Sequence, residues 1–136
     1  MTNPIKIAKN VWKIKGFSNI YFLDFNKKIL IDTGYKKDRK KIIDVKKILD
    51  RDKIEIVIFT HLHYDHIWNF DLFRNAEFFC SKQEFYDYVN YKKDAILNNE
   101  IADKFNINLN VIETIRDELN FLFDTEKLND NPDSIF

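Results

Sequence analysis

The most constraining feature of the chain is the segment Ile54 to Phe59, where β-branched and aromatic residues occupy every position except Glu55. Such a run is typical of a strand that is covered on both faces. A strand buried in this way needs helices or a second sheet on each side, so the segment favours a layered α/β fold.

Strands and helices alternate along the rest of the chain. Alternating or β-branched patterns predict further strands at Ile5 to Ala8, Val11 to Lys15, Asn19 to Phe25, Lys27 to Asp32 and Ala76 to Cys80. Apolar residues at three- and four-residue steps predict helices at Lys36 to Leu49, Ser81 to about Asn90, Ala95 to Phe105 and Val111 to Phe123. Ser81 and Glu84 have the spacing of a capping box at a helix start. The polar tail from Asp124 is expected to be loosely ordered.

The composition fits one globular domain over residues 1–136, since 45% of the residues are hydrophobic. Lys and Arg total 22, as do Asp and Glu, so the chain has no general attraction for nucleic acid or an anionic membrane. Cys80 is the single cysteine, which rules out an intrachain disulfide. Residues Met1 to Lys9 contain no long apolar run. We therefore expect a cytoplasmic protein with no membrane partner.

The chemistry of the chain is concentrated directly after the buried strand. All three histidines, His61, His63 and His66, fall within six residues, together with Asp65. Imidazole and carboxylate groups are ligands of zinc and similar metals. In an extended segment His61 and His63 share a side, so they can bind one metal, while Asp65 and His66 must turn toward a second. A histidine-rich loop without metal is the alternative, and a zinc finger is excluded because the cysteines are lacking.

The segment His61-x-His63-x-Asp65-His66 resembles the signature of the metallo-β-lactamase superfamily. The hairpin before it, with Asn19 to Leu23 and Ile29 to Gly34, also resembles that family, down to the Asp-x-Gly turn at its end. The resemblance covers about Val11 to Tyr88 and fades beyond Asn90.

This resemblance implies an αβ/βα sandwich with metals at one edge. By analogy His61 and His63 bind the first metal, and Asp65 and His66 bind the second. Asp65 is thereby the candidate catalytic residue. Asp32 is expected either to accept the free N–H of a ligand histidine or to be a simple turn residue.

The expected cofactor is zinc, up to two ions in a complete site, although other divalent metals are compatible. Flavodiiron proteins of the superfamily carry glutamate at the position of His63, which disfavours di-iron chemistry. A metal pair supplies activated water for hydrolysis. The expected substrate is therefore a small molecule with an ester, lactone, thioester or phosphodiester bond.

The chain departs from the family after the motif. No histidine follows His66, although the complete site needs two more histidines and a bridging aspartate. Residues 91 to 136 show mainly helical periodicity, so we expect the first sheet and its helices to be present and the second sheet to be largely missing. One apolar face of the first sheet would then stay open.

Three interpretations remain open at this stage. The chain is an incomplete hydrolase domain from a truncated or split gene, a subunit completed by a homo-oligomer or a complementary C-terminal half, or a metal-binding module without turnover. In each case the isolated chain is expected to bind zinc weakly and to be inactive alone. The aromatic residues after the motif, such as Trp68 and Phe70, are interpreted as core or interface residues in preference to residues that line a pocket.

Overall fold

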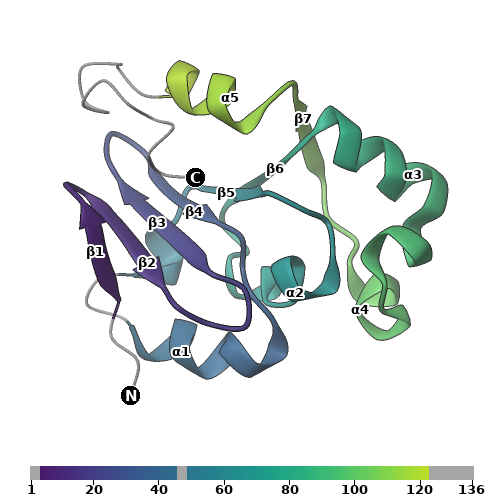
Figure 1. Cartoon of the computed structure of the whole chain (residues 1–136), viewed down its shortest axis with the longest axis horizontal. Coiled ribbons are helices and arrows are strands. Elements are labelled where there is room, and N and C mark those ends of the chain that lie inside the picture. Colours follow the sequence, from purple (N-terminus) through teal and green to yellow (C-terminus); the bar gives the residue numbers. More distant parts are fainter. Residues whose placement is uncertain (1–3, 46–48, 123–136) are drawn as a thin grey trace.

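Seven strands form one mixed sheet in the structure, a computed structural model that describes residues 4–45 and 49–122. The strands follow one another across the sheet in chain order, from β1 at one edge to β7 at the other (Figure 1). Their bounds are β1 Ile5–Ala8, β2 Val11–Ile14, β3 Ile20–Asp24, β4 Lys28–Ile31, β5 Ile56–Phe59, β6 Glu77–Ser81 and β7 Leu109–Ile112. The pairs from β1 to β4 are antiparallel, and the pairs from β4 to β7 are parallel.

Parallel neighbours need crossover connections, and each crossover of this chain carries helical segments. The first carries η1 Lys36–Asp38, α1 Arg39–Asp44 and η2 Arg51–Lys53, and the second carries α2 Tyr64–Ile67 and η3 Phe70–Leu72. The third carries α3 Lys82–Ile96 and α4 Asn99–Lys104, and α5 Ile115–Leu122 follows the last strand. The predicted α/β class is confirmed. None of the helices in this described part of the chain is long and apolar enough to cross a membrane.

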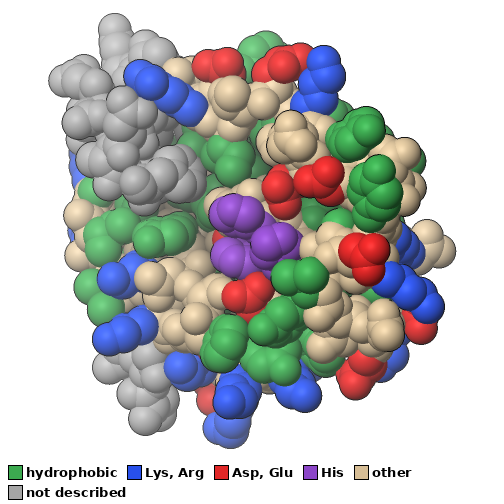
Figure 2. Space-filling view, turned by 45° about the vertical axis from the view of Figure 1, so that its right-hand side comes forward, with side chains coloured by type: hydrophobic (Ala, Val, Ile, Leu, Met, Phe, Trp, Pro, Cys, Tyr) green, Lys and Arg blue, Asp and Glu red, His purple; other side chains and the backbone are tan. Residues whose placement is uncertain are grey.

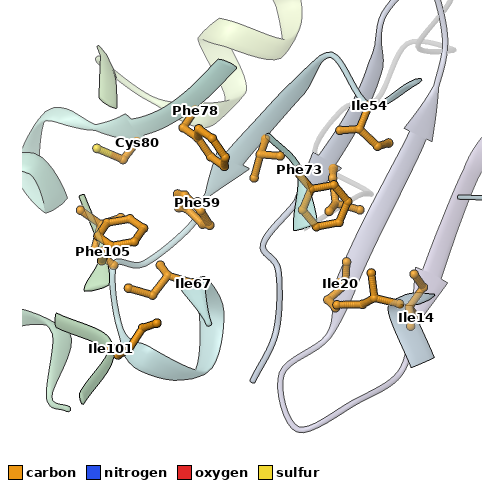
Figure 3. Close-up of a cluster of buried hydrophobic side chains, with 14 of the residues drawn as sticks. Ile14, Ile20, Ile54, Phe59, Ile67, Phe73, Phe78, Cys80, Ile101 and Phe105 are labelled. Atoms are coloured by element: carbon orange, nitrogen blue, oxygen red, sulfur yellow. The ribbon is translucent and has the colours of Figure 1, made fainter. Parts of the chain in front are cut away.

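Side chains of strands β2 to β7 alternate between two buried clusters, as the pleat requires, whereas β1 at the edge is exposed. In β5, Val57 and Phe59 belong to the larger cluster, while Ile56 and Ile58 belong to the smaller one. The larger cluster packs the sheet against residues of α1 to α4, with Phe59 stacked on Phe78 at a ring distance of 5.8 Å (Figure 3). Because β5 is buried on all four of its residues, its carboxyl end is a rigid base for the loop that follows.

The smaller cluster corrects one expectation from the sequence. We expected an open apolar face, but Leu23, Ile29 and Ile58 on that face are fully buried. Helix α5 contributes to the cover, because its Leu119 belongs to the same cluster and its Leu122 packs against it.

The second half of the chain differs most from the predicted elements. The helix predicted over Val111 to Phe123 is instead the end of β7 followed by α5, and Phe123 lies outside the described residues. The helix predicted over Ala95 to Phe105 is divided by Leu97, whose backbone is left-handed with φ of 66°. Likewise, the helix predicted over Lys36 to Leu49 is shorter, and α1 ends at Asp44.

Candidate metal centre

The histidine segment lies at the carboxyl ends of two neighbouring parallel strands. Asp32 follows β4, and Thr60 and His61 follow β5, which pairs with β4 through Ile31 and Ile58. The backbone N–H of Asp32 donates to the carbonyl of Ile58 at 2.9 Å, so the two strand ends are held in register. In open parallel sheets this edge is where ligands bind.

A change from extended to helical backbone separates the two pairs of predicted ligands. His63 is extended, with φ of −94° and ψ of 154°, and it is the N-cap of α2. The N–H of His66 donates to the carbonyl of His63 at 2.9 Å, which closes the first turn of this helix. His61 and His63 therefore lie on the extended segment, whereas Asp65 and His66 lie on the first helical turn.

The structure brings the three imidazole rings together at the surface, as Figure 2 shows. The ring centroids lie 5.1 Å apart for His61 and His66, 5.5 Å for His61 and His63, and 6.5 Å for His63 and His66. Two imidazoles on one tetrahedral zinc ion have centroids about 5 Å apart. The two shorter separations are close to this value.

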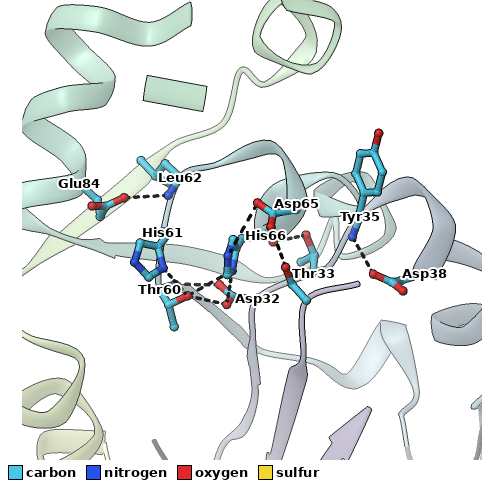
Figure 4. Close-up of polar contacts among 11 residues, drawn as sticks. Asp32, Thr33, Tyr35, Asp38, Thr60, His61, Leu62, Asp65, His66 and Glu84 are labelled. Atoms are coloured by element: carbon cyan, nitrogen blue, oxygen red, sulfur yellow. Dashed lines mark hydrogen bonds and ion pairs between the residues drawn. The ribbon is translucent and has the colours of Figure 1, made fainter. Parts of the chain in front are cut away.

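His66 is oriented by a buried carboxylate (Figure 4). Its Nδ1 atom lies 2.8 Å from Oδ2 of Asp32, a residue whose surface is only 3% exposed. Burial lowers the pKa of His66, but the hydrogen bond and charge of Asp32, with the charges of Asp65 and Glu84, outweigh it and raise that pKa. The carboxylate also fixes the ring so that Nε2 faces away from Asp32.

Asp32 is itself held by Thr60. The Thr60 N–H donates to Oδ1 of Asp32 at 2.8 Å, and the Thr60 hydroxyl donates to Oδ2 at 2.5 Å. Asp32 has a positive φ of 65°, which few residues other than glycine, asparagine and aspartate adopt readily. The predicted hydrogen bond between Asp32 and a ring of the motif is present, and the role of Asp32 toward a metal stays a prediction.

Asp65 lies beside the free nitrogen of His66. Its Oδ1 atom is 3.8 Å from Nε2 of His66, and its Oδ2 atom accepts a hydrogen bond from the hydroxyl of Ser18 at 2.9 Å. Donor atoms on one tetrahedral zinc ion are about 3.3 Å apart, so this pair needs little movement to share an ion. Ser18 comes from the loop between β2 and β3 and was not among the site residues predicted from the sequence.

Two further contacts hold the backbone of the motif. Thr33 donates to the carbonyl of His66 through its N–H at 2.7 Å and its hydroxyl at 3.0 Å. Glu84 accepts from the N–H of Leu62 at 3.0 Å. In the capping box predicted from the sequence, Ser81 does accept from the N–H of Glu84, but the Glu84 carboxylate contacts the motif. The spacing of Ser81 and Glu84 did not predict this role of Glu84.

A buried aspartate joins the loops around the site. Asp38 is 1% exposed and accepts backbone N–H groups from Phe17 at 3.1 Å and from Tyr35 at 3.0 Å. A Cβ atom on Gly16 would overlap its carboxylate, and one on Gly34 would lie 2.9 Å from Oδ2. These are the two glycines of the chain. Both loops therefore depend on a close backbone approach to Asp38, which the sequence analysis did not single out.

Imidazole and carboxylate groups are suitable zinc ligands, and they lie near one another in pairs. No pair by itself supplies the ligands that one zinc ion needs. Among the residues described, 4–45 and 49–122, no group of three or more His, Cys, Asp or Glu side chains is placed to hold one ion. A structural or catalytic zinc site takes three or four protein ligands. The described donors therefore lie near one another without forming a complete set of ligands for one ion, and their grouping around two metals stays a prediction.

The chain belongs to the metallo-β-lactamase superfamily, because the model of that family matches residues 14–125. A protein named as a probable metallo-hydrolase from Methanocaldococcus jannaschii is 46% identical over 61 residues, which are 42% of this chain and 29% of that relative. Another, from Streptococcus pyogenes, is 36% identical over 72 residues, which are 53% of this chain and 30% of that relative. The matches thus span less than a third of the length of these curated relatives.

Solved structures show the same fold. The crystal structure of a candidate metallo-β-lactamase from Thermotoga maritima superposes with a TM-score of 0.59 at 24% sequence identity. The match covers 83% of this chain and 56% of that chain. The described sheet and helices therefore form part of the αβ/βα sandwich.

Proposed function

We propose that this chain supplies the zinc-binding motif of a hydrolase that cleaves an ester, lactone, thioester or phosphodiester bond. The observation that carries the proposal is the alignment of Asp32, His66 and Asp65. Asp32 occupies Nδ1 of His66, which leaves Nε2 available 3.8 Å from a carboxylate oxygen of Asp65. Carboxylate, histidine and metal in this order are the usual arrangement of a zinc site.

The four residues of the motif have distinct tasks in this proposal. His61 and His63 would hold one zinc ion, and Asp65 and His66 would hold a second. When bound, zinc lowers the pKa of water and polarises the bond under attack. Asp65 is the candidate catalytic residue because its carboxylate would lie beside the bound metal, and Ser18 keeps it oriented through the 2.9 Å hydrogen bond. The absence of a second cysteine supports a cytoplasmic location for this activity.

A second candidate function follows from the donor count. Because the described residues offer only pairs of donors, the motif would be completed by ligands from another chain, either a second copy or a complementary half. In that case the isolated chain binds zinc weakly and has no turnover of its own.

Zinc binding by equilibrium dialysis tests the proposal. We expect the purified chain to bind zinc, and His61→Ala and Asp65→Ala each to weaken binding by at least about tenfold. Asp94→Ala, at an exposed carboxylate on α3, is the matched control and should bind zinc like the unchanged chain. Equal binding by all four proteins would contradict the proposal.

Activity assays separate the two candidates. The chain would be tested with zinc against generic ester, lactone, thioester and phosphodiester substrates, alone and at increasing protein concentration. Turnover that rises more than linearly with concentration and is lost in Asp65→Ala supports a site shared between copies. Turnover that is independent of self-association supports a complete site in one chain.

A further inference from the structure

Four aromatic side chains form a continuous patch beside the candidate metal centre. The ring of Tyr35 is at its middle, with ring centroids of Phe17 at 5.1 Å, Tyr64 at 5.2 Å and Trp68 at 5.3 Å. These four residues are here called the aromatic patch. None of them belongs to the two buried clusters as a fully buried member, and Phe17 is 55% exposed.

The aromatic patch directly adjoins the residues proposed to bind metal. Tyr64 stands between His63 and Asp65 in the sequence, and Phe17 precedes Ser18, whose hydroxyl contacts Asp65. In Figure 2, hydrophobic side chains lie immediately below the histidines and the acidic side chain next to them. A molecule bound at the metal centre would thus extend over these rings.

Two lysines lie over rings of the patch. The Nζ atom of Lys36 lies 5.5 Å from the ring centroids of both Tyr35 and Trp68, and that of Lys37 lies 6.0 Å from Phe17. Neither lysine has a carboxylate within ion-pair distance among the residues that the structure describes. Their positive charges are therefore available to an anion.

The backbone beneath the patch is fixed, so the rings are presented in one arrangement. The N–H of Tyr35 donates to Asp38, and its carbonyl accepts from the side chain of Asn69 at 2.9 Å. The N–H of Trp68 donates to the carbonyl of Gly34 at 3.1 Å. A preorganised surface loses little conformational entropy when a ligand binds.

We propose that the aromatic patch, with Lys36 and Lys37, binds a part of the substrate that carries both an apolar group and a negative charge. The apolar or aromatic group stacks on the rings, and the anion lies between the two ammonium groups. The substrate is thereby narrowed to small organic molecules that carry an apolar group and an acidic group beside the bond that is cleaved. This inference rests on the proposed hydrolase function for the identity of the reacting bond.

Charge complementarity favours a small anion over the other ligands that aromatic surfaces attract. A neutral apolar compound would gain nothing from the lysines, and a cation would be repelled by them. Single-stranded nucleic acid also stacks on aromatic rings, but it needs a charged groove along its backbone. This chain has equal numbers of basic and acidic residues.

Ligand titration of the metal-free chain followed by NMR tests the inference independently of zinc binding. The probes are 4-phenylbutyrate, its uncharged amide and 4-phenylbutylammonium, and the readout is the indole N–H signal of Trp68. We expect 4-phenylbutyrate to shift this signal and to bind about fivefold more tightly than the amide, with the ammonium compound weaker still. The double variant Lys36→Ala/Lys37→Ala should remove the preference for the anion.

A charge-matched double variant controls for the loss of two lysines. Lys6→Ala/Lys92→Ala removes two lysines that also lie over rings, each 5.5 Å from the centroid of Trp12 or Tyr88, but outside the patch. This control should bind 4-phenylbutyrate as the unchanged chain does. If it loses the preference equally, the effect is one of overall charge and the inference is wrong.

Three other results would also overturn the inference. These are equal affinity for the three probes, no shift of the Trp68 signal, or tighter binding of hexa-adenylate than of 4-phenylbutyrate. Because zinc is removed beforehand, the measured affinity for the anion does not depend on whether the chain binds zinc. The two proposals are therefore tested separately.

Discussion

Asp32 and His66 are joined across two neighbouring parallel strands, with Oδ2 of Asp32 2.8 Å from Nδ1 of His66. Asp32 directly follows β4 in the left-handed conformation, and its carboxylate contacts His66 in the first turn of α2. The contact therefore couples the backbone geometry of β4 to the direction of one imidazole of the motif.

Asp32→Asn should weaken zinc binding by about 10- to 100-fold. Asparagine tolerates the positive φ and can still accept from the N–H of Thr60, but its amide nitrogen cannot accept a proton from His66. Competition with a chromogenic chelator would measure the affinity. Asp24→Asn is the control, because Asp24 is a surface residue paired with Lys28. Equal affinities of the two variants would show that Asp32 is only a turn residue.

Gly16→Ala should destabilise the fold by about 1–3 kcal/mol, because the new Cβ would overlap the carboxylate of Asp38. The same substitution in an Asp38→Ala background should cost less, since the obstructing group is gone. Urea denaturation of the four proteins gives the coupling free energy. A coupling free energy of zero would show that there is no steric conflict between the new side chain at position 16 and Asp38.

The stability that Asp71 contributes should disappear in acid. A hydrogen bond from Arg39 holds the pKa of Asp71 below its ordinary value of 3.8, against the opposing effect of burial and with help from the charge of Arg39. A carboxylate with a lowered folded-state pKa adds stability above the unfolded-state value, and that stability is lost as the pH falls through the folded-state pKa.

The side chains of Arg39 and Asp71 are each 40% exposed, so Asp71→Asn should cost only about 0.2–1 kcal/mol at pH 7. The difference from the unchanged chain should shrink toward zero below the pKa of Asp71. Urea denaturation across this pH range measures it. In an Arg39→Ala background the pH-dependent difference should be clearly smaller, because only the backbone hydrogen bond of Asp71 and the charge of Arg74 then lower its pKa. A difference of unchanged size would refute the assignment to the Arg39 pair.

Cys80 should be almost unreactive in the folded chain. Burial, with a smaller effect from the charge of Glu84, raises the pKa of its thiol to about 12. At pH 8 a disulfide reagent should therefore modify the native chain about 100-fold or more slowly than the chain in urea. Cys80 is the single cysteine, so the rate reports one site. Rapid modification without denaturant would show that this part of the core opens easily.

The part of the site that the sequence predicted is the part encoded by adjacent residues. The motif from His61 to His66 follows a strand whose composition identifies it, and both features are local. Ser18, Asp38 and Glu84 act on partners that are 47, 21 and 22 positions away. Spacing within a segment carries no information about such contacts, so Ser18, the contact of Asp38 with Phe17 and the contact of Glu84 with the motif were missed.

The missed strand has a different physical cause. Ile112 at the end of β7 and Leu119 in α5 pack into the same buried cluster. Their apolar spacing therefore continues across Glu113 and Thr114 as if one helix ran through them. The boundary is marked by the hydroxyl of Thr114, which accepts from the N–H of Asp117 at 3.1 Å, a capping contact that was overlooked.

Asp38 also limits how the mouth of the site can move. Its carboxylate accepts hydrogen bonds from the backbone of Phe17 on one loop and of Tyr35 on another. Gly16 and Gly34, which precede these residues, lie so close to Asp38 that a Cβ atom would not fit. Neither loop can swing outward without breaking a partly buried hydrogen bond to Asp38, so the positions of the two loops are coupled through this side chain. A movement of these loops would displace the rings of Phe17 and Tyr35 together with Ser18, which orients Asp65. Such a movement would alter ligand access and carboxylate alignment in the same step.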